Sequence, residues 1–166
     1  MVLGMSIETF TQLHVVISLI GIVTGVIALA GMLRSSRPGW VTHVFLITTA
    51  LTTITGFLFP ITAFTPALGT GIVSTLFLIP AFAALYAFRL AGAWRWIYAV
   101  TAIVALYLNC FVLVVQSFQK LPALAALAPT QSEPPFLIAQ GVLLLAFLWL
   151  GYRAVKQFHP PALAAA

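Results

Sequence analysis

One apolar segment of this chain carries most of the side chains that could do chemistry in a hydrocarbon environment. Its polar side chains belong to Tyr98, Asn109, Gln116 and Lys120. They are spaced eleven, seven and four residues apart, so an α-helix presents them within one narrow sector of its surface. An amide in hydrocarbon costs several kcal/mol unless a polar partner meets it. Asn109 therefore either joins two helices by a hydrogen bond or contributes to a binding site.

Other apolar segments also carry polar side chains near the ends that are predicted to reach the outer surface of the bilayer. The candidate ligand-binding residues are His14, Asn109, Gln116, Lys120, Glu133 and Gln140. Their amide, imidazole, ammonium and carboxylate groups could hold a small or lipid-like molecule in a pocket open to the outside. Hydrogen bonding of these groups to one another is the alternative interpretation.

Signatures of independent catalysis are missing from the sequence. Glu8 and Glu133 are the only carboxylate side chains, no H-E-x-x-H or glycine-rich phosphate loop occurs, and Cys110 has no second cysteine to pair with. His14 and His43 could each ligate a haem, but they begin helices of opposite direction and so belong near opposite faces of a bilayer. We therefore predict no catalytic residue, no metal site and no cofactor.

Composition predicts the elements that must position these groups. Of 166 residues, 63% are hydrophobic and 5% are charged, whereas a soluble domain carries roughly 25% charged residues. A helix needs about 20 apolar residues to cross the hydrocarbon, where every backbone amide must be bonded within the segment. Five segments meet this requirement, at about residues 13–33, 41–59, 71–88, 97–118 and 136–152. The sequence thus predicts an all-α, polytopic membrane protein in which residues 1–166 form a single five-helix bundle.

Basic residues indicate the direction of these helices. Six of the seven Lys and Arg residues lie in the first connector, in the third connector and after the fifth segment, as Arg34, Arg37, Arg89, Arg95, Arg153 and Lys156. Because Lys and Arg are retained on the cytoplasmic side, the N-terminus is predicted outside and the C-terminus in the cytoplasm. Aromatic residues support the same inner boundary: Trp40, Trp94, Trp96, Tyr98, Trp149 and Tyr152 are expected at the headgroup level.

Small residues and a proline predict how the bundle packs. Ser18, Gly21, Gly25 and Ala28 recur at three- and four-residue steps, which leaves a groove that another helix can approach closely. That helix belongs either to the same chain or to another subunit. Pro80 removes one backbone hydrogen bond from the third segment, so a kink is expected there.

The fourth connector is longer than a simple turn between helices requires. It spans residues 119–135, and its apolar centre predicts a short helix lying in the outer interface. Lys120 and Glu133 stand near its two ends and could pair across it.

Three stretches of the chain resemble a group of small bacterial inner-membrane proteins that have no assigned function. They read LAGAWRWIY from Leu90, LYLNCFVLVVQSFQKLPAL from Leu106 and APTQSEPPF from Ala128. The resemblance covers most of the chain and implies a five-span protein of the bacterial cytoplasmic membrane. It draws attention to Asn109, Gln116 and Lys120, and it assigns no catalytic residue.

Three classes of function follow from these observations. The leading hypothesis is a non-enzymatic inner-membrane protein that binds or translocates a small or lipid-like ligand through the polar pocket in its outer half. The second is an accessory or structural subunit of a larger membrane complex or homo-oligomer, with the groove from Ser18 to Ala28 as its contact. The third is a quinone- or haem-linked redox subunit that uses His14, Tyr107 and Asn109. The lipid bilayer is the expected partner of all three, and nucleic acid is not.

Overall fold

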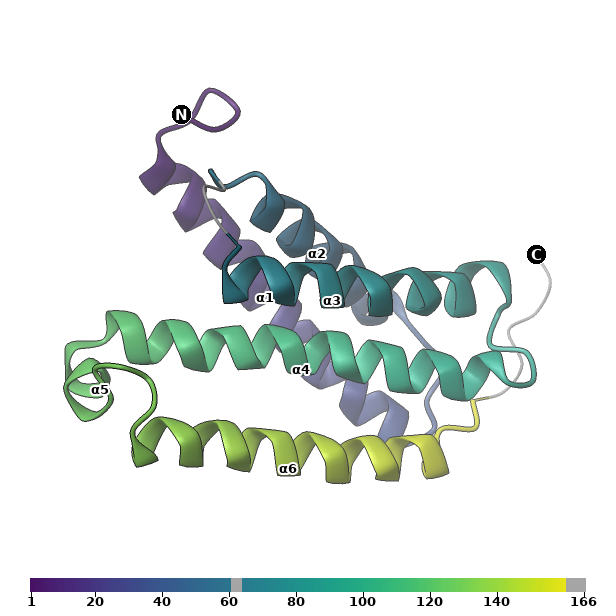
Figure 1. The fold of residues 1–166 in the computed structure, drawn as a ribbon. Coiled ribbons are helices and arrows are strands. Elements are labelled where there is room, and N and C mark those ends of the chain that lie inside the picture. Colours follow the sequence, from purple (N-terminus) through teal and green to yellow (C-terminus); the bar gives the residue numbers. More distant parts are fainter. Residues whose placement is uncertain (61–63, 161–166) are drawn as a thin grey trace.

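The computed structural model describes residues 1–60 and 64–160 and shows an all-α protein (Figure 1). Its elements are α1 (Ile7–Leu33), α2 (Trp40–Phe57), α3 (Pro66–Phe82), the π-helix η1 (Ala83–Ala87), α4 (Trp94–Lys120), α5 (Pro122–Leu127) and α6 (Pro134–Gln157). Among the described residues, five helical stretches are long and apolar enough to cross a membrane, with α3 and η1 counted as one. The predicted fold class is confirmed in this respect. Residues 61–63 of the second connector and 161–166 of the tail lie outside the described residues.

The helices α1, α4 and α6 extend beyond the apolar runs from which they were predicted. α1 begins at Ile7, where the Ser6 hydroxyl accepts a hydrogen bond from the Thr9 N–H and caps the helix. α4 continues to Lys120, and α6 continues to Gln157. Polar residues can occupy such helix ends because the ends project from the hydrocarbon into the headgroup region. The short helix expected in the fourth connector is confirmed as α5, Pro122–Leu127.

Pro80 lies inside α3, one turn before the helix changes its hydrogen-bonding pattern. Proline donates no backbone hydrogen bond, so the carbonyl one turn earlier loses its helical partner. The following turn is π-helical, and the Phe88 N–H donates to the Ala83 carbonyl at 2.9 Å. The structure thus shows a π-helical turn just after the position where the sequence predicted a kink.

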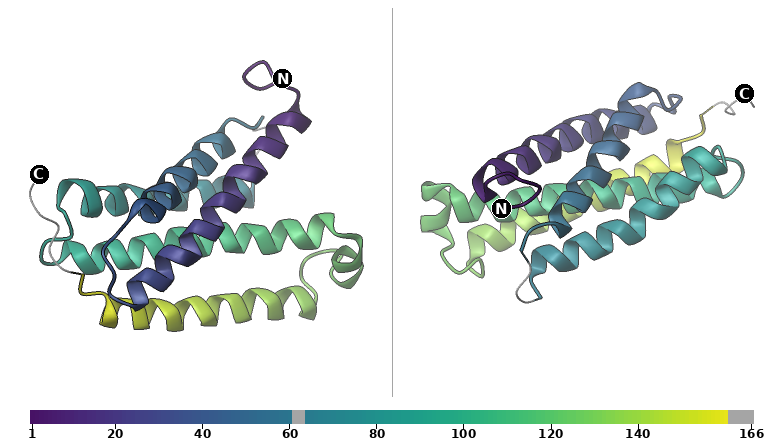
Figure 2. Two further views of the ribbon diagram at one scale, coloured as in Figure 1. Left: turned by 180° about the vertical axis from the view of Figure 1, so that it is seen from behind. Right: turned by 90° about the horizontal axis from the view of Figure 1, so that it is seen from above.

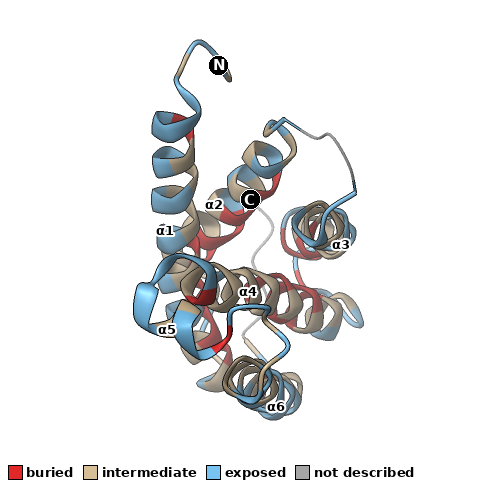
Figure 3. Ribbon diagram, turned by 60° about the vertical axis from the view of Figure 1, so that its left-hand side comes forward, coloured by how far each residue is buried: buried red, intermediate tan, exposed pale blue. Residues whose placement is uncertain are grey.

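α4 is the central helix of the bundle. It contacts α1, α2, α3, α5 and α6, whereas the strongest contact of α1 is with α2. The α1–α2 hairpin crosses α4 obliquely, and α6 runs beside α4 on the other side (Figures 1 and 2). Buried residues gather where the other helices face α4 (Figure 3). The core is therefore organised around one helix.

Gly21, Gly25 and Ala28 lie in the interface of α1 with α2 and α4. A Cβ atom added to Gly21 would stand 3.2 Å from the Thr48 hydroxyl oxygen, and one added to Gly25 would stand 2.5 Å from Leu106 Cδ1. Ala28 is buried in the same core, and the Ser18 hydroxyl donates to the carbonyl of His14 one turn back. The groove predicted on α1 is thus occupied by helices of the same chain.

Two helices present broad apolar surfaces to the exterior. The exposed apolar side chains of α1 include Leu13, Val16, Leu19, Ile20, Val23, Val26 and Ile27, and those of α6 include Leu137, Ile138, Val142, Leu145 and Leu148. Contiguous apolar surface of this extent is rare on soluble monomers and is the surface that lipid covers.

Candidate functional site

The basic residues gather at one end of the bundle, which we call the cationic end. It carries Arg34, Arg37, Arg89, Arg95, Arg153 and Lys156. Two hydrogen bonds join the helix ends there: Arg95 Nη1 donates to the Phe158 carbonyl at 2.5 Å, and the His159 N–H donates to the Ser35 hydroxyl at 2.7 Å. Lys120, the last residue of α4, and the short helix α5 lie at the opposite end. The polar residues predicted to bind a ligand belong mainly to the half nearer this opposite end.

His14 is half-buried between α1 and α2. Its Nδ1 atom lies 2.7 Å from the Thr55 hydroxyl oxygen, and its ring meets Phe59 edge to face. His14 of α1 is thus joined to α2 through the Thr55 hydroxyl.

Asn109 joins α4 to α2. Its Nδ2 atom donates to the hydroxyl oxygen of Thr49 at 3.2 Å, and Thr49 is fully buried. Gln116 is two turns further along the same face of α4 and is half-buried. Among the described residues, the Gln116 side chain forms no hydrogen bond. Asn109, Gln116 and Lys120 thus lie along one face of α4, and His14 lies on the neighbouring α1–α2 hairpin. We call these four residues the polar seam.

Gln140 lies away from the polar seam. Its Nε2 atom donates to the Phe111 carbonyl of α4 at 3.2 Å, from the α6 side, while its Oε1 atom is buried without a partner among the described residues. α2 and α6 flank α4 on different sides (Figure 3). α4 therefore lies between Asn109 and Gln140, and the two side chains do not face one common pocket.

Glu133 is bound within its own loop at the start of α6. Its carboxylate accepts hydrogen bonds from the Thr130 N–H at 3.1 Å, the Thr130 hydroxyl at 2.9 Å and the Ser132 N–H at 3.1 Å. Desolvation by nearby residues raises the pKa of this carboxyl. The hydrogen bonds together outweigh this desolvation and hold the pKa below its usual value. Glu133 thus orders the loop before α6 and does not reach into the polar seam.

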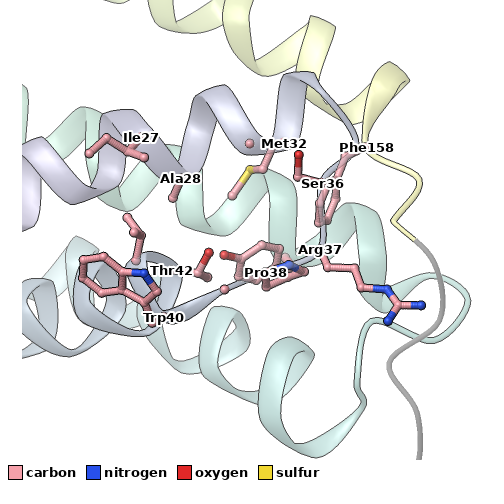
Figure 4. Close-up of a pocket in the computed structure, with 13 residues that line it drawn as sticks. Ile27, Ala28, Met32, Ser36, Arg37, Pro38, Trp40, Thr42 and Phe158 are labelled. Carbon is pink, nitrogen blue, oxygen red and sulfur yellow. The ribbon is translucent and has the colours of Figure 1, made fainter.

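A cavity of about 200 Å³ opens at the cationic end, between α1 and α2 (Figure 4). Its walls come from the C-terminal turns of α1, the connector from Ser36 to Gly39, the first turn of α2, Tyr98 and Phe158. Figure 4 shows Thr42 within the cavity and Arg37 at its rim, with the guanidinium extended outward. Sequence analysis missed this site because its lining comes from four separate segments.

Tyr98 lies near the predicted inner end of its helix, as expected, but it is buried inside the bundle. It is 1% exposed, lines the cavity and has no hydrogen-bond partner for its OH group among the described residues. The Thr42 side chain is its neighbour but does not meet the geometry of a hydrogen bond. Tyr98 shares the polar sector of α4 with Asn109, and that shared sector was the one sequence signal pointing to this position.

Residues able to hold a metal ion do not converge in the described structure. Within residues 1–60 and 64–160, no three His, Cys, Asp or Glu side chains gather around one point. His14 pairs with Thr55, whereas His43 Nδ1 lies 2.6 Å from the Tyr86 hydroxyl near the cationic end. The two histidines thus belong to opposite ends of the α1–α2 hairpin.

The five long apolar helices are those of a multi-pass integral membrane protein. Comparisons with protein-family models, curated proteins and solved structures return no match for this chain. Its function is therefore inferred below from its own residues and their geometry.

Proposed function

We propose that this chain is a non-enzymatic protein of the bacterial inner membrane that binds, or helps to translocate, a small or lipid-like ligand along the polar seam. The N-terminus and the Lys120 end face outward, and the cationic end faces the cytoplasm, because Lys and Arg are retained on the cytoplasmic side. The ligand would reach the seam from the outer half of the bilayer.

The main observation behind this proposal is that the Gln116 amide has no hydrogen-bond partner among the described residues. A half-buried amide in a membrane bundle costs free energy unless a polar group meets it. Asn109 and His14 have such partners in Thr49 and Thr55, but the Gln116 side chain has none among the described residues. An amide and the nearby ammonium of Lys120 offer donors and an acceptor to a molecule that carries an oxygen-rich polar group.

The polar seam is tested by two matched Gln→Leu variants. Gln116→Leu removes an amide of the seam, whereas Gln140→Leu removes an amide on the α6 side of α4. Wild type and both variants are purified in parallel, and retained small molecules are measured by mass spectrometry. We expect wild type and Gln140→Leu to retain the same molecule, and Gln116→Leu to lose most of it. Equal retention by all three, or no molecule retained by wild type, would contradict the proposal.

The proposed orientation predicts which loops are reached from outside the cell. In a Cys110→Ser background, Ser132→Cys should react with a membrane-impermeant maleimide in intact cells, because the loop before α6 faces outward. Ser36→Cys, at the cationic end, should react only after lysis. The reverse pattern would overturn the orientation.

A further inference from the structure

We infer that the cavity at the cationic end is a binding site for one anionic phospholipid whose headgroup carries hydroxyls, with phosphatidylglycerol as the representative chemistry. The phosphate would lie at the rim between Arg37 and the first turn of α2. The headgroup hydroxyls would enter the cavity toward Thr42 and Tyr98. This site lies at the other end of the bundle from the polar seam and does not depend on it.

The first turn of α2 has free backbone N–H groups that can bind an anion. Its N-cap residue, Gly39, has no side chain to accept hydrogen bonds from the turn. Within the described residues, the N–H groups of Trp40 and Val41 donate to no carbonyl or side chain. Both residues line the cavity. Free N–H groups and the positive end of the helix dipole together favour a phosphate oxygen at this position.

The Tyr98 hydroxyl independently points to a binding site in the cavity. It is almost completely buried on the cavity wall and has no hydrogen-bond partner among the described residues. A buried hydroxyl without a partner is unfavourable, and native proteins rarely keep one without a reason. A headgroup hydroxyl inside the cavity would satisfy it and would meet Thr42 at the same time.

The charge of Arg37 at the cationic end also favours an external anion. Six of the seven basic residues lie there, while the two acidic side chains, Glu8 and Glu133, belong to the opposite end. Among the described residues, Arg37 forms no ion pair and is exposed at the cavity rim. Arg37 is therefore available to an anion at the cavity rim.

The surroundings of the cavity favour a lipid over a soluble phosphate compound. Ile27 and Trp40 flank it and are 52% and 74% exposed. Val23, one turn before Ile27 on α1, is 59% exposed and continues this apolar row toward the middle of the membrane. An acyl chain can follow that row while the headgroup of the same lipid occupies the cavity.

The test is a titration of the full-length protein, in dodecyl maltoside micelles, with dioleoylphosphatidylglycerol, followed by native mass spectrometry. We expect one tightly bound lipid per chain. Arg37→Gln should weaken its binding about tenfold and Tyr98→Phe about fivefold, as expected for loss of a charged and of a neutral hydrogen bond. Arg34→Gln, the same change at the same end but outside the cavity lining, should alter binding less than about twofold.

Two further ligands distinguish the source of the phosphate. Dioleoylphosphatidylcholine, whose head carries a cation and no hydroxyl, should bind at least about tenfold more weakly than phosphatidylglycerol. Glycerol 3-phosphate should not displace the lipid at equal concentration. Wild-type binding by both Arg37→Gln and Tyr98→Phe, or equal binding of the two lipids, would overturn the site. Full displacement by glycerol 3-phosphate would overturn the assignment to a lipid. Because Arg37 is exposed, Arg37→Gln remains informative even if Tyr98→Phe folds poorly.

Discussion

Replacing Gly25 by valine is expected to lower the free energy of unfolding by about 3 kcal/mol, at the upper end of the range for overpacked cores. A Cβ atom at this position would stand 2.5 Å from Leu106 Cδ1 and 2.8 Å from two carbon atoms of the Phe45 ring. Leu106 and Phe45 are each 1% exposed, so neither side chain can move aside without disturbing the core. The effect is measured as the shift of the unfolding transition in sodium dodecyl sulfate, followed by circular dichroism.

Gly141→Val is the matched control for this prediction. It makes the same change in a helix, and a Cβ atom added there meets nothing within 4 Å. The difference between the two variants therefore reports packing at Gly25 rather than the helix propensity of valine. Equal transitions for the two variants would show that α1 does not pack closely against α2 and α4 at Gly25.

Hydrophobic runs sufficed to predict the five spanning helices, because lipid requires each of them to bond its own backbone. The ends were harder to predict, because polar residues such as Glu8 and Lys120 belong to the helices but interrupt the apolar pattern. Ser6 did carry a recognisable capping signal, since its side chain precedes the first turn and accepts from Thr9.

Helical spacing predicted which polar residues share a face of α4 but not what that face meets. Asn109 forms a hydrogen bond with Thr49, which is 60 residues away in the sequence. Tyr98 lines a cavity that is formed mainly by α1, α2 and their connector. Such pairings depend on how the helices cross, and spacing along one helix contains no information about that. For the same reason, the division between Asn109 and Gln140 could not be predicted from the sequence.

The polar face of α4 is directed at the α1–α2 hairpin at two of its positions, Tyr98 and Asn109. Tyr98 lies at the cavity, Asn109 is joined to Thr49 near the middle of the helix, and Lys120 is its last residue. A single interhelical hydrogen bond inside a membrane protein contributes only about 0.6 kcal/mol on average. The Asn109–Thr49 hydrogen bond is therefore expected to contribute less than about 1 kcal/mol to stability.

Phe158→Ala is expected to lower the free energy of unfolding by about 4 kcal/mol, the usual cost of truncating a buried phenylalanine. Phe158 follows the last turn of α6, lies beyond the predicted span and is 1% exposed. Its ring centroid is 5.9 Å from that of Tyr98, and its carbonyl accepts the hydrogen bond from Arg95. This one residue thus fastens the end of α6 to the start of α4.

Two companion variants separate the contribution of the Phe158 ring from that of general apolar surface. Leu148→Ala removes an apolar side chain that is 60% exposed on α6, and it should cost less than about 1 kcal/mol because lipid or detergent covers that position in either state. Phe158→Leu keeps most of the buried volume and should cost about 1.5 kcal/mol. Unfolding in sodium dodecyl sulfate ranks the three variants. If Phe158→Ala lowered the free energy of unfolding no more than Leu148→Ala, the segment after α6 would not be anchored on Tyr98. The part of the cavity wall that Phe158 forms at the cationic end would then not be a stable part of the fold.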